Sequence, residues 1–131
     1  MRNAFVDRLH DEAIALLLAS RDWATKGASA LSTGSDPIEN LKIATATLRL
    51  TALVTDAVAW TLAQKAFAAG ELSEKEAMAD RWTTLPLAAE NFTAALPETL
   101  ADLIEKAEMF HRRVTNLHAQ RRNRMNRRRS R

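Results

Sequence analysis

Residues 36–70 constrain the fold more than any other part of this chain, because they predict one long helix that is apolar on more than one side. Asp36 stands as an N-cap, Pro37 at the first helical position and Glu39 three residues after the cap. Gly70 suits the left-handed position that follows a helix. At 1.5 Å per residue this helix would be about 50 Å long, so we expect it to be the central element.

A membrane span is not expected in this helix. A spanning helix needs about 20 mainly apolar residues, but only 15 positions separate Arg49 from Lys65, and Asp56 lies among them. An acid at the centre of an inserted helix costs about 2.5 to 3.5 kcal/mol. The apolar run at residues 13–19 is shorter still and follows two acids rather than the basic start of a signal peptide. We therefore expect a cytoplasmic protein without a membrane segment.

The rest of the chain also shows helical spacing of apolar residues. A first helix is expected over residues 3–25, short helices near 73–80 and 87–95, and a third long helix from Pro97. The third helix carries an a/d seam at Leu100, Leu103, Ala107, Phe110, Val114 and Leu117. These elements predict an all-α fold, a three-helix up-down-up bundle with a partly helical connector between the second and third helices.

The long helix has more apolar surface than one core requires. One broad face is predicted to pack on the two neighbouring helices and contains Leu41, Leu48, Val54, Val58 and Leu62. A second stripe consists of Leu53, Trp60 and Phe67, seven residues apart. Two interpretations remain open for this stripe: the connector covers it, or it binds a partner or a second copy of the chain. Arg49 and Asp56 share nearly one azimuth, and are either a charged link to a neighbour or ordinary boundary charges.

Residues 121–131 hold seven arginines and no acid, whereas the first 120 residues carry 12 basic and 16 acidic side chains. We predict a bundle domain at 1–120 and a disordered arginine-rich tail at 121–131. The tail is expected to act as a spacer or to attract an acidic protein partner. Binding of nucleic acid through phosphate contacts is the alternative, which the acidic body does not favour. The candidate partner-binding residues are Leu53, Asp56, Trp60, Phe67, Arg121, Arg122, Arg124, Arg127, Arg128 and Arg129.

No residue pattern predicts catalysis, a cofactor or a metal. The absence of cysteine excludes disulfides, thiolate zinc sites and a cysteine nucleophile, and the three glycines form no phosphate-binding loop. Asp7 with His10, and Glu108 with His111, have the acid and histidine spacing of di-iron bundles. The further glutamates that such a site requires are missing at matching heights, so we expect no catalytic, cofactor-binding or metal-binding residue.

Two segments, "LHDEAIALLLASRDW" at 9–23 and "LRLTALVTDAVAWTLAQKAFAAGELS" at 48–73, resemble the RcdA family, the regulators of CtrA degradation. The resemblance covers roughly residues 5–118. It implies a three-helix bundle, a homodimer, that performs no chemistry and acts as an adaptor in bacterial cell-cycle control. Adaptors of this family help the ClpXP protease, primed by a response regulator, to receive protein cargo. The implied mechanism is tethering, in which a raised effective concentration replaces a strong direct encounter.

Overall fold

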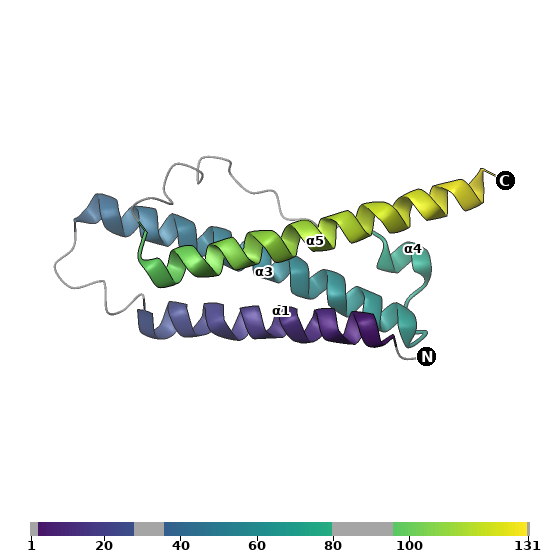
Figure 1. The fold of residues 1–131 in the computed structure, drawn as a ribbon, viewed down its shortest axis with the longest axis horizontal. Helices are drawn as coiled ribbons and strands as arrows, with labels where there is room; N and C mark the ends of the chain where they lie inside the picture. The colour runs from purple at the N-terminus through teal and green to yellow at the C-terminus, as the bar shows by residue number, and fades with distance from the viewer. Residues whose placement is uncertain (1–2, 28–35, 80–95, 131) are drawn as a thin grey trace.

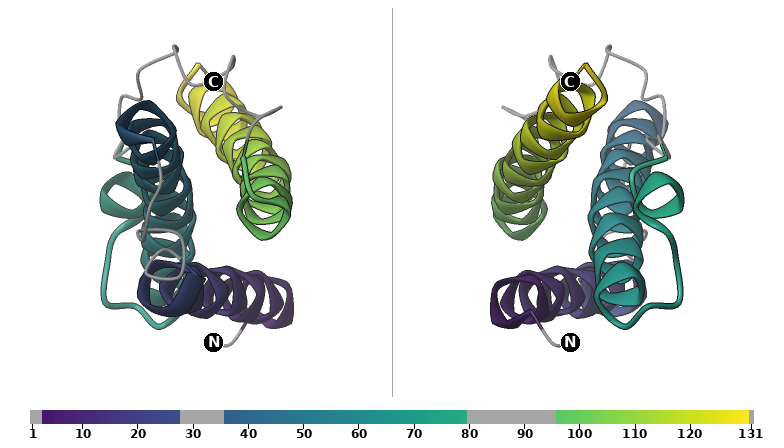
Figure 2. Two further views of the ribbon diagram at one scale, coloured as in Figure 1. Left: turned by 90° about the vertical axis from the view of Figure 1, so that its left-hand side faces the viewer. Right: turned by 90° about the vertical axis from the view of Figure 1, so that its right-hand side faces the viewer.

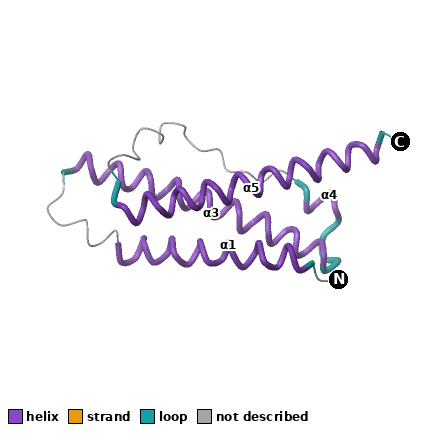
Figure 3. The backbone as a smooth tube through the Cα atoms, in the orientation of Figure 1, coloured by secondary structure: helices purple, strands orange, loops and turns teal. Residues whose placement is uncertain are grey.

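The computed structural model describes residues 3–27, 36–79 and 96–130. Within these ranges every regular element is helical, as Figure 3 shows, so the predicted all-α class is confirmed. The elements are α1 (Ala4–Asp22), a π-helical turn η1 (Trp23–Gly27), α3 (Pro37–Ala68), α4 (Glu74–Ala77) and α5 (Glu98–Arg129). The short helix predicted at 87–95 lies outside the described residues.

The helix boundaries follow from the capping residues. The Asn3 side chain accepts hydrogen bonds from the first amides of α1, and Asp36 accepts one from the amide of Ile38 at 3.1 Å. Ser73 and Glu76 form a complete capping box around α4. Gly70 has φ of +80°, the left-handed conformation expected after α3.

The three long helices pack along one another, but α5 does not run in the predicted direction (Figure 1). α1 is antiparallel to α3, because Lys65 contacts Asp7 at one end and Thr47 contacts Trp23 at the other. Residue numbers increase in the same direction along α3 and α5, because Arg49 bonds Glu108 whereas Trp60, later in α3, bonds His118, later in α5. These two helices are therefore parallel. The order is therefore up-down-down rather than up-down-up. Residues 69–97 between the two helices are enough chain to return along the bundle before α5 begins.

The core lies where α3 faces both α1 and α5, and Figure 2 shows α3 beside α5 with α1 across one side of the pair. One buried cluster contains Trp23, Ala46, Leu50, Leu53, Val54, Leu100, Leu103, Ile104 and Ala107. A second contains Leu9, Ala13, Ala57, Trp60, Phe110 and Val114. The predicted seam of α5 is confirmed, since five of its six residues are buried and Leu117 is half-buried.

The arginine-rich segment is helical where disorder was predicted, because α5 continues to Arg129. Arginine is a good helix former, and no glycine or proline interrupts residues 98–130. This end contacts the body of the bundle: Arg128 donates to Glu74 of α4 at 3.0 Å, and the Arg121 guanidinium lies 5.8 Å from the centre of the Phe67 ring. The boundary expected between 120 and 121 therefore falls inside one continuous helix.

α3 is long and apolar enough to cross a membrane by length and composition alone. A core helix of a soluble protein passes the same test, so this is weak evidence for a span. α3 also buries Asp56 and Gln64 against its neighbours, and such groups are costly in hydrocarbon.

Candidate partner-binding surfaces

A row of polar contacts joins the facing sides of α3 and α5. Arg49 donates two hydrogen bonds to Glu108 Oε1, at 2.9 and 3.1 Å. His111 Nε2 lies 3.1 Å from Asp56 Oδ2. A carboxylate only accepts hydrogen bonds, so this histidine nitrogen carries the hydrogen. The charged link to a neighbouring helix, one of two interpretations of Arg49 and Asp56, is confirmed.

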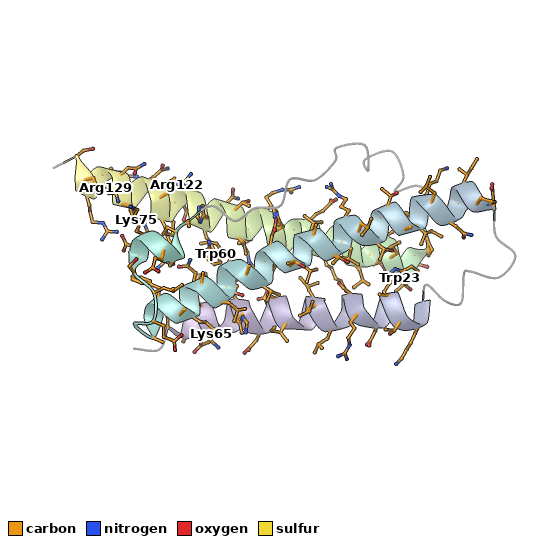
Figure 4. The ribbon with its side chains drawn as sticks, turned by 180° about the vertical axis from the view of Figure 1, so that it is seen from behind. Trp23, Trp60, Lys65, Lys75, Arg122 and Arg129 are labelled. Atoms are coloured by element: carbon orange, nitrogen blue, oxygen red, sulfur yellow. The ribbon has the colours of Figure 1, made fainter. Side chains whose placement is uncertain are left out.

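The row ends in a buried pair of aromatic side chains. Trp60 Nε1 donates to His118 Nδ1 at 3.1 Å, and both side chains are buried. Since the indole N–H is only a donor, His118 Nδ1 is the acceptor of this hydrogen bond. Figure 4 shows Trp60 on α3 within the body of the bundle. His118 is therefore a core residue, 5% exposed.

Three of the predicted partner-binding residues lie in this interior. Leu53, Asp56 and Trp60 are 4%, 3% and 7% exposed. Phe67, further along the same stripe, is half-buried, with Arg121 over its ring. In the described part of the chain, α5 covers this stripe. Neither interpretation of the sequence placed α5 there, because both assumed that α5 packs on the other apolar face of the long helix. A partner role for these four residues stays a prediction.

The outer face of α3 is instead the exposed one. Leu41, Leu48 and Leu62 were predicted to face the core, but they are 67%, 71% and 51% exposed. Only Val54 of that predicted face is fully buried, and Val58 is half-buried. We define the α3 seam by nine positions that repeat at three and four residues along this face: Ile38, Leu41, Thr45, Leu48, Ala52, Thr55, Ala59, Leu62 and Ala66.

The α3 seam has the spacing of a coiled-coil a/d stripe and contains no charged residue. At 100° per residue its centre lies roughly opposite the buried face of α3. The sequence contains one indication of the α3 seam, the seven-residue repeat of Leu41, Leu48, Thr55 and Leu62. That repeat could not be separated from the core stripe without knowing on which side α1 and α5 pack.

The six arginines that were predicted to bind a partner lie on different sides of α5. Arg121, Arg124 and Arg128 line a cleft against α4 together with Glu74. Arg122, Arg127 and Arg129 are exposed at other positions of the same helix, two of them labelled in Figure 4. Burial lowers the pKa of Arg121, the neighbouring Arg124 lowers it further, and Glu74 acts in the opposite direction.

The two acid and histidine pairs that have the spacing of di-iron sites form hydrogen bonds or ion pairs with other side chains. His10 Nδ1 lies 3.0 Å from Thr61 Oγ1, and Asp7 pairs with Lys65. Glu108 and His111 bond Arg49 and Asp56 respectively. Over residues 3–27, 36–79 and 96–130, the structure brings together no group of three side chains that could hold a metal.

Comparisons with known proteins identify the fold. A family model described as "Protein of unknown function (DUF1465)" matches residues 1–130. No curated protein matches the chain. Among solved structures, the crystal structure of RcdA from Caulobacter crescentus CB15 is similar, with a TM-score of 0.73 and 24% sequence identity over 91% of this chain and 92% of that one. At this identity the likeness establishes the arrangement of helices.

Proposed function

The chain belongs to the DUF1465 family, which is the RcdA family, and we propose that it is a non-enzymatic adaptor that helps to deliver cell-cycle regulators to the ClpXP protease by tethering. The observation that carries this proposal is the match of the family model to residues 1–130. The sequence resemblance described above supplies the adaptor role. The proposal includes a cytoplasmic location, a priming response regulator and protein cargo.

The distribution of surface chemistry supports an adaptor. Tethering requires separate surfaces for separate partners rather than a reactive centre. The described part of the chain has an uncharged outer face on α3 and an arginine-rich end on α5. An adaptor of this kind would hold cargo at one surface and the primed protease at the other.

We assign the α3 seam to a homodimer, in which two copies of α3 pack antiparallel. In that arrangement large residues of one copy face small residues of the other. With the centre between Ala52 and Thr55, Leu41 faces Ala66 and Leu48 faces Ala59 of the second copy. This alternation of leucine with alanine or threonine makes the seam complementary to itself.

Charge and length also favour a second copy as the occupant. The seam extends for about 42 Å along α3. Of the charged residues of α3, Arg49 and Asp56 are bonded to α5. Lys65 pairs with Asp7, and Lys42 with Glu39. These charged side chains of α3 are thus already paired within the chain, which favours an uncharged occupant for the seam. A self-complementary apolar face is what a two-fold symmetric interface requires.

The test is a degradation assay with purified ClpXP, its priming response regulator and candidate regulatory proteins from the same bacterium. Adding the full chain should accelerate turnover of particular cargo proteins, and the acceleration should require the primed protease. No acceleration of any cargo, combined with salt-sensitive binding of the chain to DNA, would contradict the adaptor role and favour a nucleic-acid function for the arginine-rich end of α5.

A further inference from the structure

We name the cleft between α4 and the end of α5 the arginine cleft. Its lining contains more arginines than carboxylates, so it carries a net positive charge. Its volume is about 140 Å³, and it is lined by Glu74, Met78, Arg121, Arg124, Met125 and Arg128. The three arginines lie on one face of α5 because they are three and four residues apart. Glu74 is the one carboxylate among these lining residues, and it is bonded to Arg128.

The guanidinium of Arg121 is in an unfavourable position for a cation. It is partly withdrawn from water and lies close to Arg124, and both effects lower its pKa. Its contact with the Phe67 ring supplies only part of the lost solvation. A negatively charged group in the cleft would be attracted by the half-buried Arg121 and the exposed Arg124 together.

The rest of the lining is apolar. Met78 is buried and Met125 is half-buried. Thioether side chains are polarizable and flexible, and so accept apolar groups of varied shape. The cleft therefore combines donors for a carboxylate with a surface for an adjoining hydrophobic side chain.

A nucleic acid fits this site less well than a peptide. A phosphate backbone needs a continuous line of basic groups. The segment that forms the α4 wall carries Glu71, Glu74 and Glu76 against one cation, Lys75, and its net negative charge opposes a long polyanion. A short peptide presents its negative charge over a smaller length.

We propose that the arginine cleft binds a short acidic segment of a protein partner, with a carboxylate on Arg121 and Arg124 and a neighbouring apolar side chain on Met78 and Met125. Glu74, which is bonded to Arg128 and is also close enough to attract Arg121, is the internal competitor for the positive charge of the cleft. This inference rests on the proposed adaptor function and specifies the chemistry by which that function recognises one partner.

The experiment measures fluorescence anisotropy of a labelled peptide of alternating Glu and Leu against the full chain. Arg124→Gln should weaken binding about tenfold, the effect of losing one hydrogen bond to a charged group. Arg127→Gln removes the same charge from a residue outside the cleft lining and should change binding by less than about twofold. Glu74→Gln should strengthen binding, since it removes the competing carboxylate.

Equal weakening by Arg124→Gln and Arg127→Gln would overturn the site, because it would show general attraction to the helix. Stronger binding of a single-stranded oligonucleotide, also lost in Arg124→Gln, would overturn the peptide assignment. Both measurements are made without protease. Peptide binding without accelerated degradation would therefore contradict the adaptor function alone, whereas accelerated degradation without peptide binding would contradict this site alone.

Discussion

His111 of α5 lies with Nε2 3.1 Å from Oδ2 of Asp56 on α3, and the Asp56 carboxylate is almost completely enclosed. Asp56 is the acid that interrupts the long apolar stretch of the sequence. Its position is explained by the parallel packing of α5, which brings a histidine N–H to it. A buried charge is tolerated when such a partner is present.

Loss of this partner should destabilise the bundle. His111→Leu leaves the Asp56 carboxylate without that hydrogen bond and should lower the free energy of unfolding by about 3 kcal/mol. Replacing both residues by leucine should recover part of the loss, since no buried charge then remains. Urea unfolding followed by circular dichroism measures both effects. A double variant as unstable as the sum of the single variants would contradict this account.

Trp60→Phe should also destabilise the protein, because it removes the N–H that donates to His118 and leaves a buried acceptor without it. The expected loss is about 1 to 2 kcal/mol. Trp23→Phe is the matched control. It removes a similar bond to Thr47, but that hydroxyl is less buried and keeps its bond to the Ile43 carbonyl. Equal losses from the two substitutions would contradict the assigned role of His118.

Leu48→Glu should convert a dimer into a monomer without loss of helicity. The side chain is 71% exposed within one chain, so the charge is accommodated in the monomer, whereas two such charges would lie inside the proposed α3 interface. Analytical ultracentrifugation measures the mass. Met109→Glu, at another exposed apolar position, on α5, should leave the mass unchanged. A dimer that survives Leu48→Glu would exclude the α3 seam as its interface.

Deletion of residues 121–131 should lower the stability of the bundle as well as weaken association with acidic partners. Arg128 with Glu74 and Arg121 with Phe67 link this segment to the body. Contacts of these types are worth about 1 kcal/mol or less each, so the unfolding free energy should fall by about 1 to 2 kcal/mol. The double variant Arg127→Gln/Arg129→Gln should unfold like the unmodified chain. Unchanged unfolding after the deletion would show that the segment does not pack.

Local sequence signals predicted the helices of the described part of the chain. The cap at Asp36, the left-handed Gly70 and the apolar seam of α5 each act over one or two helical turns, so their effect is readable without tertiary structure. The same locality explains the error at residues 121–129. Charge content predicted disorder there, whereas helix propensity and contacts with Phe67 and Glu74 support a helix.

The sequence by itself determined an all-α chain with a long, doubly apolar central helix, because helical periodicity and end caps are properties of neighbouring residues. The direction of α5, and with it which apolar side of α3 is enclosed, was decided only by the tertiary structure. Leu53 and Leu48 are the same type of residue on the same helix, yet Leu53 is 4% exposed and Leu48 is 71% exposed. Their fates differ because α5 contributes Glu108, His111 and His118 as partners to one side of α3 and leaves the other side without them.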